Sequence, residues 1–416
     1  MRRGNLRRLL TSPGACSFAL LACACGNGST DGGAASTGHL LVDAGASPGD
    51  DGSENVMDGS NAPQPSDATT TDEASADAQS PDAMPVGPPA IRYIGRFDVS
   101  QPSAPTAEWS ASAMEARFSG AQVSVRLGGS NNYFDVVLDG VVQPVLKTAG
   151  QPSYPIGVGL ASGVHDVLVF RRDEAFDNPA TFSGFGFDAG ALLAPPQAPA
   201  RRIEIVGDSI SAGYGNECGN ASDGFAAATE NEYIAYGPLA ARALSADVHV
   251  VAWSGKGLYR NLDGSTTETM PILWQRTIPT DGSSHWDPSQ WVPDVVVINL
   301  GTNDYNSGGA DPSANFQSTY LQFVKQLESA YPGVFVLGAV GPMLGGSSYA
   351  SVKTAISNIV SMRRTAGDAR VQLVEFPTQN CGSDGSACGC DSHPNAAEHQ
   401  KMATILEAAI HGALGW

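Results

Sequence analysis

Five apolar runs separated by helical patterns constrain most strongly how the second half of this chain can fold. The runs are short, continuous and rich in Val and Ile, as expected for strands buried on both faces of a parallel sheet. They are RIEIV, DVHVVAW, DVVVINL, VFVLGAV and VQLVEF, and helical patterns cover residues 232–245, 313–330, 348–365 and 395–413. This alternation predicts an α/β fold over residues 200–416, a doubly wound parallel sheet with helices on both sides.

Residues 91–195 carry a different pattern, in which apolar and polar residues alternate over short stretches. ARFSG, QVSVRLGG, YFDVVLDGVVQPVLK and VHDVLVFRR have the period of two that is typical of half-buried strands. Asp139-Gly140 lies between two β-rich runs and predicts a hairpin turn. We therefore expect an all-β, jelly-roll-like sandwich domain, followed by the linker APPQAPAR at residues 194–201.

The first 90 residues are typical of an export signal and a linker. Residues 1–25 combine a basic start, MRRGNLRR, with a short apolar core that Pro13 interrupts, which predicts a signal peptide. Leu20-Leu21-Ala22-Cys23 resembles a lipoprotein cleavage box, which predicts lipidation of Cys23, with Cys25 as the alternative. Residues 26–90 hold nine Asp, two Glu and no Lys or Arg, and they have few large apolar side chains. We expect this acidic linker to be disordered, because it cannot bury enough surface to offset its chain entropy.

Polar or small residues follow four of the five predicted strands. GDS, including Ser209, follows the first strand, WSGKGLYRN the second, GTND the third, and DSHPN comes after the fifth. Parallel strands place their carboxyl ends at one edge of the sheet, where ligands bind. Ser, Gly, Asn and His are the parts of an acyl-transfer site: a nucleophile, oxyanion donors and a base. Each block alone is weak evidence, since Ser after a strand is more often a helix cap, but the four together predict a serine hydrolase.

These blocks carry a resemblance to a known family. GDSISAGYG, GTND and DSHPN resemble the SGNH (GDSL-type) hydrolases, and EWSASAMEARFSGAQVSVRL with WSGKGLYRN resembles carbohydrate esterase family 2 within them. The resemblance implies that Ser209 is the nucleophile and an oxyanion donor through its N–H. It also implies that Gly257, or alternatively Gly255, and Asn303 are the other oxyanion donors, and that His393 is the base.

Asp391 would orient the imidazole of His393, but its spacing departs from the wider SGNH pattern. The common spacing is D-x-x-H, whereas Cys390 stands three residues before His393 and Asp391 two before. A backbone carbonyl could therefore share the task of orienting the ring. Two further acids, Asp208 and Asp304, are expected to brace the loops that carry Ser209 and Asn303 rather than to react.

Aromatic side chains near the blocks predict a sugar-binding cleft, although core packing is the ordinary alternative for each of them. The candidates are Tyr214, Trp253, Tyr259, Tyr305, Trp286 and Trp291. The polar sequence TDGSSHWDPSQW around the last two suggests a loop beside the cleft. His285 and His399 have no catalytic residues near them in the sequence and are expected to be surface or helix residues.

Four cysteines lie in the part of the chain expected to fold: Cys218, Cys381, Cys388 and Cys390. Export permits disulfides. A bond between Cys388 and Cys390 would close a strained ring, so we expect Cys218 to pair with Cys388 or with Cys390. A zinc site is a weaker alternative, and no sequence motif predicts a metal, a nucleotide or another cofactor.

The leading hypothesis is a secreted or membrane-anchored esterase that removes O-acetyl groups from carbohydrates such as acetylated xylan or glucomannan. Its expected partners are an acetylated polysaccharide or oligosaccharide and, through the lipid, a membrane surface; no protein partner is inferred. The net charge of −19 argues against nucleic acid. Two alternatives stay open: an SGNH esterase or lipase with another acyl substrate, and a carbohydrate-binding protein with vestigial catalysis.

Overall fold

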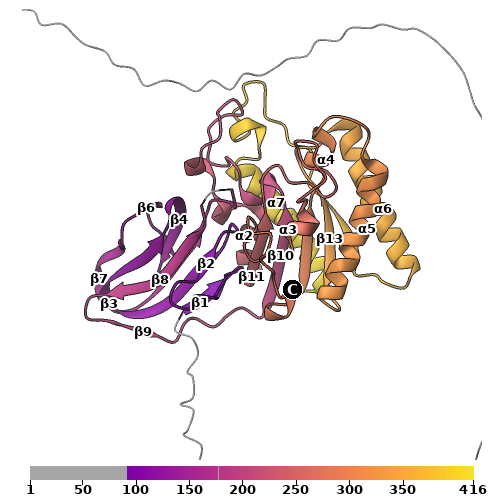
Figure 1. Cartoon of the computed structure of the whole chain (residues 1–416). Coiled ribbons are helices and arrows are strands. Elements are labelled where there is room, and N and C mark those ends of the chain that lie inside the picture. The colour runs from indigo at the N-terminus through magenta and orange to yellow at the C-terminus, as the bar shows by residue number, and fades with distance from the viewer. Residues whose placement is uncertain (1–90, 177) are drawn as a thin grey trace, which may run out of the picture. The chain divides into compact units, whose positions relative to one another are not determined.

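The computed structural model describes residues 91–176 and 178–416 (Figure 1). The predictions for residues 1–25 and 26–90, including lipidation of Cys23 or Cys25, lie outside the described residues. The described residues belong to one compact unit. No helix in the described part of the chain is long and apolar enough to cross a membrane.

The first part of the compact unit is an antiparallel β domain with nine strands in one sheet. The strands are β1 (Ile91–Ile94), β2 (Thr106–Ala107), β3 (Ala113–Gly128), β4 (Ser130–Leu138), β5 (Val141–Val142), β6 (Leu146–Ala149), β7 (Tyr154–Arg171), β8 (Ala180–Phe187) and β9 (Ala191–Leu193). Their main order is β2-β8-β3-β7-β4-β5, with β1 and β9 paired to β3 and β6 paired to β4. The predicted hairpin is present: Asp139 and Gly140, at φ 51° and 78°, join β4 to β5.

The second part is an α/β domain built on a five-stranded parallel sheet with the order β11-β10-β12-β13-β14. The strands are β10 (Arg201–Gly207), β11 (Ala246–Ala252), β12 (Val295–Asn299), β13 (Phe335–Val340) and β14 (Val371–Glu375). The helices are α1 (Ser209–Ala212), α2 (Tyr236–Ala243), α3 (Met270–Leu273), α4 (Thr302–Asn306), α5 (Ser313–Ala330), α6 (Gly346–Thr365) and α7 (Ala396–Leu414), and the 3₁₀ turns are η1 (Ala227–Thr229), η2 (Glu232–Ile234), η3 (Pro288–Gln290) and η4 (Cys390–Ser392).

Alternate residues of each parallel strand pack against different helices. Ile205 belongs to a core that includes residues of α2 and α7, whereas its neighbour Val206 belongs to a core that includes residues of α5 and α6. Figure 1 shows α5 and α6 together on one side of the strands. Each strand therefore buries both faces, which explains its continuous apolar sequence. The predicted α/β fold with a preceding β domain is confirmed.

The β domain and the α/β domain share buried contacts instead of meeting only through the linker. Ile94 and Phe170 of the β domain lie in the same core as Ile205 of β10. Arg96 donates to Glu204 at 2.8 Å, and both side chains are buried. A buried charge is stable only when it is paired, so this contact fixes one domain against the other.

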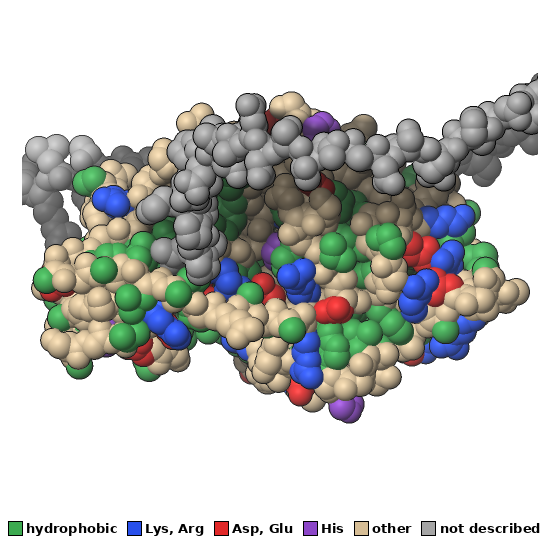
Figure 2. Space-filling model, turned by 90° about the horizontal axis from the view of Figure 1, so that it is seen from below, with side chains coloured by type: hydrophobic (Ala, Val, Ile, Leu, Met, Phe, Trp, Pro, Cys, Tyr) green, Lys and Arg blue, Asp and Glu red, His purple; other side chains and the backbone are tan. Residues whose placement is uncertain are grey.

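Charged side chains of both signs share the surface. Figure 2 shows basic and acidic side chains interspersed on one face of the molecule. Exposed ion pairs such as Lys353 with Glu375, at 2.8 Å, are part of this pattern. Such pairs contribute about 0–1 kcal/mol each to stability, so the buried cores dominate the fold.

Candidate active site

Ser209 lies at the carboxyl end of β10, where the strand turns abruptly into α1. Gly207 ends the strand, and a Cβ there would lie 2.0 Å from the Ser211 hydroxyl, so the turn requires glycine. Asp208 caps the helix, because its Oδ1 accepts the N–H of Ile210 at 3.0 Å. Burial raises the pKa of Asp208 to about 7. Ser209 itself is only 6% exposed, and the turn directs its hydroxyl toward His393.

The imidazole of His393 is placed to activate this serine. Its Nε2 lies 2.8 Å from Ser209 Oγ, and its Nδ1 lies 3.2 Å from the backbone oxygen of Cys390. A carbonyl can only accept, so Nδ1 carries the hydrogen and Nε2 is free to take the serine proton. A disulfide between Cys390 and Cys218 ties this loop to the loop that follows α1. This pairing agrees with one of the two alternatives from the sequence, and Cys381 pairs with Cys388.

The structure does not bring the Asp391 carboxylate to the Nδ1 of His393. Instead, Asp391 Oδ2 accepts the hydroxyl of Tyr214 at 2.9 Å. Asp391 and Ser392 have φ of 48° and 61°, and this left-handed turn lets the Cys390 carbonyl reach the ring. The expectation that Asp391 orients the ring directly is corrected accordingly. Burial lowers the pKa of His393, and the charge of Asp391 partly offsets this effect because it favours the protonated imidazole.

Asn303 is held in place with one amide hydrogen still available. It lies at the start of α4, after β12, and its Nδ2 donates to the backbone oxygen of Lys256 at 2.8 Å. A side-chain amide has two N–H groups, so the second can meet an oxyanion. The side chain is 5% exposed. Asn303 therefore has the position that the sequence predicted for it, beside the loop that follows β11.

Of the two glycines in that loop, Gly255 suits the oxyanion site better than Gly257. The N–H of Gly257 donates to Asn261 Oδ1 at 3.0 Å, so it is already engaged. A Cβ at Gly257 would lie 2.0 Å from the Arg260 oxygen, which gives this glycine a structural role. Gly255 has φ 77° and lines an open pocket of about 390 Å³ together with Asn261. Gly255, the alternative from the sequence, is therefore the better candidate than Gly257 for the backbone N–H that meets the oxyanion.

Asp304 braces the same loop. Its carboxylate accepts the backbone N–H groups of Leu258, Tyr259 and Arg260 at 2.9, 2.7 and 2.9 Å. Burial raises the pKa of Asp304, while these three hydrogen bonds lower it. The carboxylate thus connects α4, which carries Asn303, to the loop after β11.

Four of the predicted aromatic residues lie near these groups or near the loops that carry them. The Tyr214 ring packs on the His393 ring with centroids 4.2 Å apart. The Tyr259 hydroxyl accepts from Asn315 at 3.0 Å, and Tyr305 lines a pocket of about 320 Å³. Trp253, directly after β11, lies under the Lys256 ammonium at 4.7 Å.

Trp286 and Trp291 are elsewhere, contrary to the expectation of a cleft position beside the catalytic groups. Trp291 is 9% exposed and stacks on His249 with centroids 3.6 Å apart. The Arg96 guanidinium lies 4.8 Å from the Trp286 ring. His249 is opposite Glu204 in the sheet, well before the carboxyl ends of β10 and β11. The polar sequence around both tryptophans reflects a surface loop that packs over this part of the sheet.

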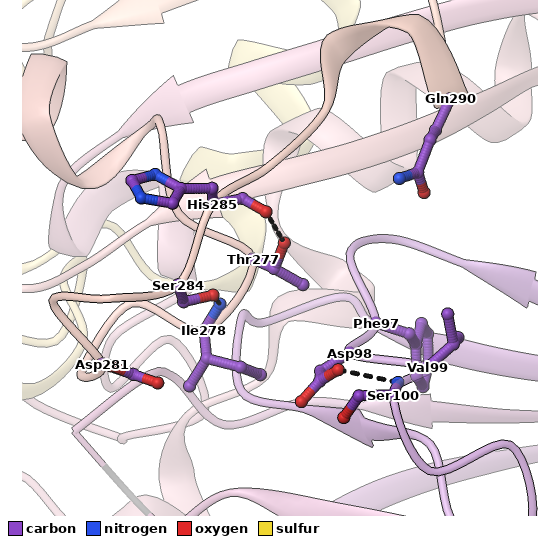
Figure 3. Close-up of a pocket in the computed structure, with 10 residues that line it drawn as sticks. All are labelled: Phe97, Asp98, Val99, Ser100, Thr277, Ile278, Asp281, Ser284, His285 and Gln290. Atoms are coloured by element: carbon purple, nitrogen blue, oxygen red, sulfur yellow. Dashed lines mark hydrogen bonds between the residues drawn. The ribbon is translucent and has the colours of Figure 1, made fainter.

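His285 and His399, for which the sequence predicted no catalytic role, make no hydrogen bond to Ser209 or His393. His285 lines a pocket of about 310 Å³ with Asp98, Thr277 and Gln290 (Figure 3). His399 lies in α7, as one alternative from the sequence had it, but it is fully buried and accepts the backbone N–H of Tyr236 at 3.1 Å. Among the described residues, no group of three or more His, Cys, Asp or Glu could hold a metal ion.

Comparison with known proteins identifies the family. A model of the carbohydrate esterase 2 N-terminal domain matches residues 93–196, and a GDSL-like lipase/acylhydrolase model matches residues 205–401. The acetylxylan esterase / glucomannan deacetylase of Cellvibrio japonicus is 30% identical over 332 residues, which are 76% of this chain and 88% of that protein. The chain belongs to carbohydrate esterase family 2.

Further relatives agree with this assignment to carbohydrate esterase family 2. The cellulase/esterase CelE of Acetivibrio thermocellus is 38% identical over 82% of this chain, although the match spans only 41% of CelE. A family two carbohydrate esterase from Clostridium thermocellum, solved in complex with cellohexaose, is 37% identical with a TM-score of 0.74. That match covers 78% of this chain and 99% of the other. The chain is thus an esterase of the GDSL class with the fold of this family.

Three features of the site were not predicted from the sequence. They are the carboxylate of Glu174, which bonds to Ser254, the ring of Phe225, which stacks on Tyr214, and the identity of the carbonyl that holds His393, which is that of Cys390; the sequence allowed only for some backbone carbonyl. The sequence RRDE at the end of β7 carried one usable signal. Four successive charged residues, 171–174, stand where a predicted apolar strand ends, and all four are buried.

We expect the enzyme to stay active well below pH 6.5. Burial lowers the pKa of His393 to about 4. The imidazole acts as a base only when it is neutral, and it is neutral above its pKa, so activity is lost only as pH falls toward that value. The measurement is kcat/KM for p-nitrophenyl acetate from about pH 3.5 to about pH 8, which reports the free enzyme. An acidic limb centred at or above pH 6.5 would contradict the burial of this ring.

Proposed function

We propose that this chain removes O-acetyl groups from carbohydrates through an acetyl-enzyme on Ser209. The observation that carries the proposal is the 2.8 Å contact between Ser209 Oγ and His393 Nε2 at the edge of the sheet. A serine hydroxyl is a weak nucleophile until a neighbouring base takes its proton. The amide of Asn303 nearby supplies the donor that an oxyanion needs.

The reaction follows from these positions. Ser209 Oγ attacks the carbonyl carbon of the acetyl group while its proton moves to His393 Nε2. The negative oxygen accepts hydrogen bonds from the N–H groups of Ser209 and Gly255 and from Asn303 Nδ2. His393 then gives the proton to the sugar oxygen, which leaves as a free hydroxyl. A water molecule repeats the attack on acetyl-Ser209, and acetate leaves.

The surroundings of the site support a small acyl group on a polar alcohol. The pocket beside Gly255 is lined by Ser254, Lys256, Asn261, Leu262 and Asp263. Only one of these five side chains is aliphatic, which is a poor match for a long acyl chain. Tyr259 and Tyr305 lie in or beside the loops that carry the oxyanion donors, and tyrosine faces can stack on sugar rings. The names of two relatives, one with acetylxylan and glucomannan and one solved with cellohexaose, point to the same substrate class.

We expect a steep preference for acetyl over longer acyl groups. On p-nitrophenyl esters, kcat/KM should fall by about tenfold or more from acetate to butyrate, because the pocket is open and Leu262 is its one aliphatic side chain, so little protein surface encloses a longer chain. The measurement compares acetate, butyrate and octanoate esters. Higher values for butyrate or octanoate than for acetate would favour the alternative, an SGNH esterase or lipase with another acyl substrate.

We further propose secretion and a lipid anchor at Cys23. The support is the sequence alone: a basic start, a short apolar core and the box that ends at Cys23. Two or more acyl chains hold a protein stably on a membrane, whereas one gives only reversible binding. Cys23→Ser should release the full-length protein from the membrane fraction of its host, and if Cys25 carries the lipid instead, only Cys25→Ser will do so.

A further inference from the structure

Residues 172–176 leave the end of β7 in the β domain and lie against the catalytic part of the α/β domain. Arg172, Asp173 and Glu174 are at most 1% exposed. Charged side chains are rarely buried so completely unless they have partners. Arg172 pairs with Asp135 of the β domain and with Glu217 of the α/β domain, and its Nε also donates to the backbone oxygen of Glu230 at 2.8 Å.

Glu174 reaches the loop that carries the proposed oxyanion donor. One oxygen of its carboxylate accepts the backbone N–H of Ser254, and the other accepts the Ser254 hydroxyl. Ser254 is the residue directly before Gly255. Hydrogen bonds to a carboxylate are stronger than those between neutral groups. The backbone at Gly255 is therefore held from one side by a residue of the β domain.

The same segment is connected to the base indirectly, through a row of aromatic rings. Phe176 packs edge-to-face on Phe225, with centroids 5.7 Å apart. Phe225 stacks on Tyr214 at 4.1 Å, and Tyr214 packs on His393 at 4.2 Å. Residues 172–176 thus contact the oxyanion loop directly and the imidazole only through Phe225 and Tyr214.

We propose that Glu174 is a positioning residue, which aims the Gly255 N–H at the oxyanion by fixing Ser254, and that the β domain is thereby part of the catalytic apparatus. This inference rests on the proposed function, since it assumes that Ser209 and Gly255 act as described. Preorganised donors stabilise the transition state because they need no rearrangement during the reaction. A loosened Gly255 would lose that advantage in the chemical step and not in substrate binding.

The chain contains a closely matched control for this contact. Glu108, also in the β domain and 1% exposed, accepts the backbone N–H and the hydroxyl of Thr280 at 3.1 and 2.8 Å. Thr280 belongs to the α/β domain but lies in the polar loop near His285, away from Ser209. The two glutamates therefore make the same type of contact between the domains, and only one of them makes it at the oxyanion loop.

The test measures kcat and KM for p-nitrophenyl acetate in Glu174→Ala, Glu174→Gln and Glu108→Ala, in the full chain. Active sites are counted with an organophosphonate that labels the serine, and unfolding is followed by thermal melting. Glu174→Ala should lower kcat per active site by about 10–100-fold, a part of the 10²–10³ that loss of a whole oxyanion donor costs. KM should change by less than about threefold. Glu108→Ala should lose comparable thermal stability but keep kcat within about threefold.

Glu174→Gln should restore most of the rate, because its amide oxygen can still accept the Ser254 N–H and its NH₂ can donate to the hydroxyl. If Glu174→Ala does not fold, Ser254→Ala replaces it and should lower kcat by about 3–10-fold, with Thr280→Ala as its matched control. Equal kcat values in the Glu174 and Glu108 variants, or a loss confined to KM, would overturn the positioning role. Ser209→Ala is assayed in parallel. If it remains active, the proposed function fails. If it is inactive, the Glu174 variants test the positioning role alone.

Discussion

Ser209→Ala should leave a folded protein whose turnover is lower by about 10⁶-fold. Removing the nucleophile of a serine hydrolase has an effect of this size, because the remaining groups act as one unit with it. The side chain is small and 6% exposed, so its replacement by Ala removes one hydroxyl and leaves little empty space. The assay is kcat for p-nitrophenyl acetate, with thermal melting as the check on folding.

Ser211→Ala is the matched control for this variant. Ser211 lies two residues away in the same short helix, and its hydroxyl contacts Tyr236 Oη at 2.8 Å instead of His393. We expect a loss of stability there but a turnover within about tenfold of the wild type. A Ser209→Ala enzyme that kept more than a few per cent of the rate would show that another group attacks the ester.

His393→Ala should be nearly as damaging as loss of the nucleophile, whereas Asp391→Ala should lower turnover by only about tenfold. His393 moves the proton, and in a serine hydrolase its loss costs about as much as loss of the serine. The Asp391 carboxylate bonds to Tyr214 and not to the ring; the carbonyl of Cys390, 3.2 Å from Nδ1, sets the tautomer. What the Asp391 variant loses is a charge near the imidazole and the hydrogen bond from Tyr214.

Tyr214→Phe separates those two losses, because it removes only the hydroxyl that donates to Asp391 and keeps the ring that packs on His393. Its turnover should lie between that of the wild type and that of Asp391→Ala. Near-complete loss in Asp391→Ala would instead show that the carboxylate orients the imidazole during the reaction, and the carbonyl of Cys390 would then be no substitute.

The strands and helices of the α/β domain could be predicted because one requirement, the burial of apolar side chains, dominates their sequence patterns. Strands buried on both faces need continuous apolar runs, and the helix predicted at residues 313–330 is α5 with the same bounds. The placement of Ser209, Asn303 and His393 could be predicted for a similar reason. Each follows a parallel strand, so the fold brings all three to one edge of the sheet.

The details that the sequence did not predict depend on the path of the backbone or on contacts between distant residues. The role of the Cys390 carbonyl follows from positive φ at Asp391 and Ser392, which non-glycine side chains rarely indicate. The choice between Gly255 and Gly257 depends on where the Asn261 side chain points. Glu174 is 80 residues from Ser254, and no local pattern connects them.

The positions of Trp286 and Trp291 could not be predicted from the sequence. Their polar neighbours indicate a loop, and the stacking of Trp291 on His249 depends on tertiary structure alone. Aromatic residues in polar loops can face a ligand or cover a sheet. The local sequence pattern does not distinguish these two cases. The sugar-binding prediction is therefore kept only for the aromatic residues near the catalytic loops.

The most direct test of the proposed function is the release of acetate from acetylated polysaccharide by the full chain. Acetylated glucomannan and acetylated xylan are incubated with the wild type and with Ser209→Ala, and free acetate is measured over time. We expect the wild type to release acetate from at least one of the two polymers and Ser209→Ala to release none above the background. A wild-type enzyme that hydrolyses p-nitrophenyl acetate but frees no acetate from either polymer or from their acetylated oligosaccharides would contradict a carbohydrate substrate.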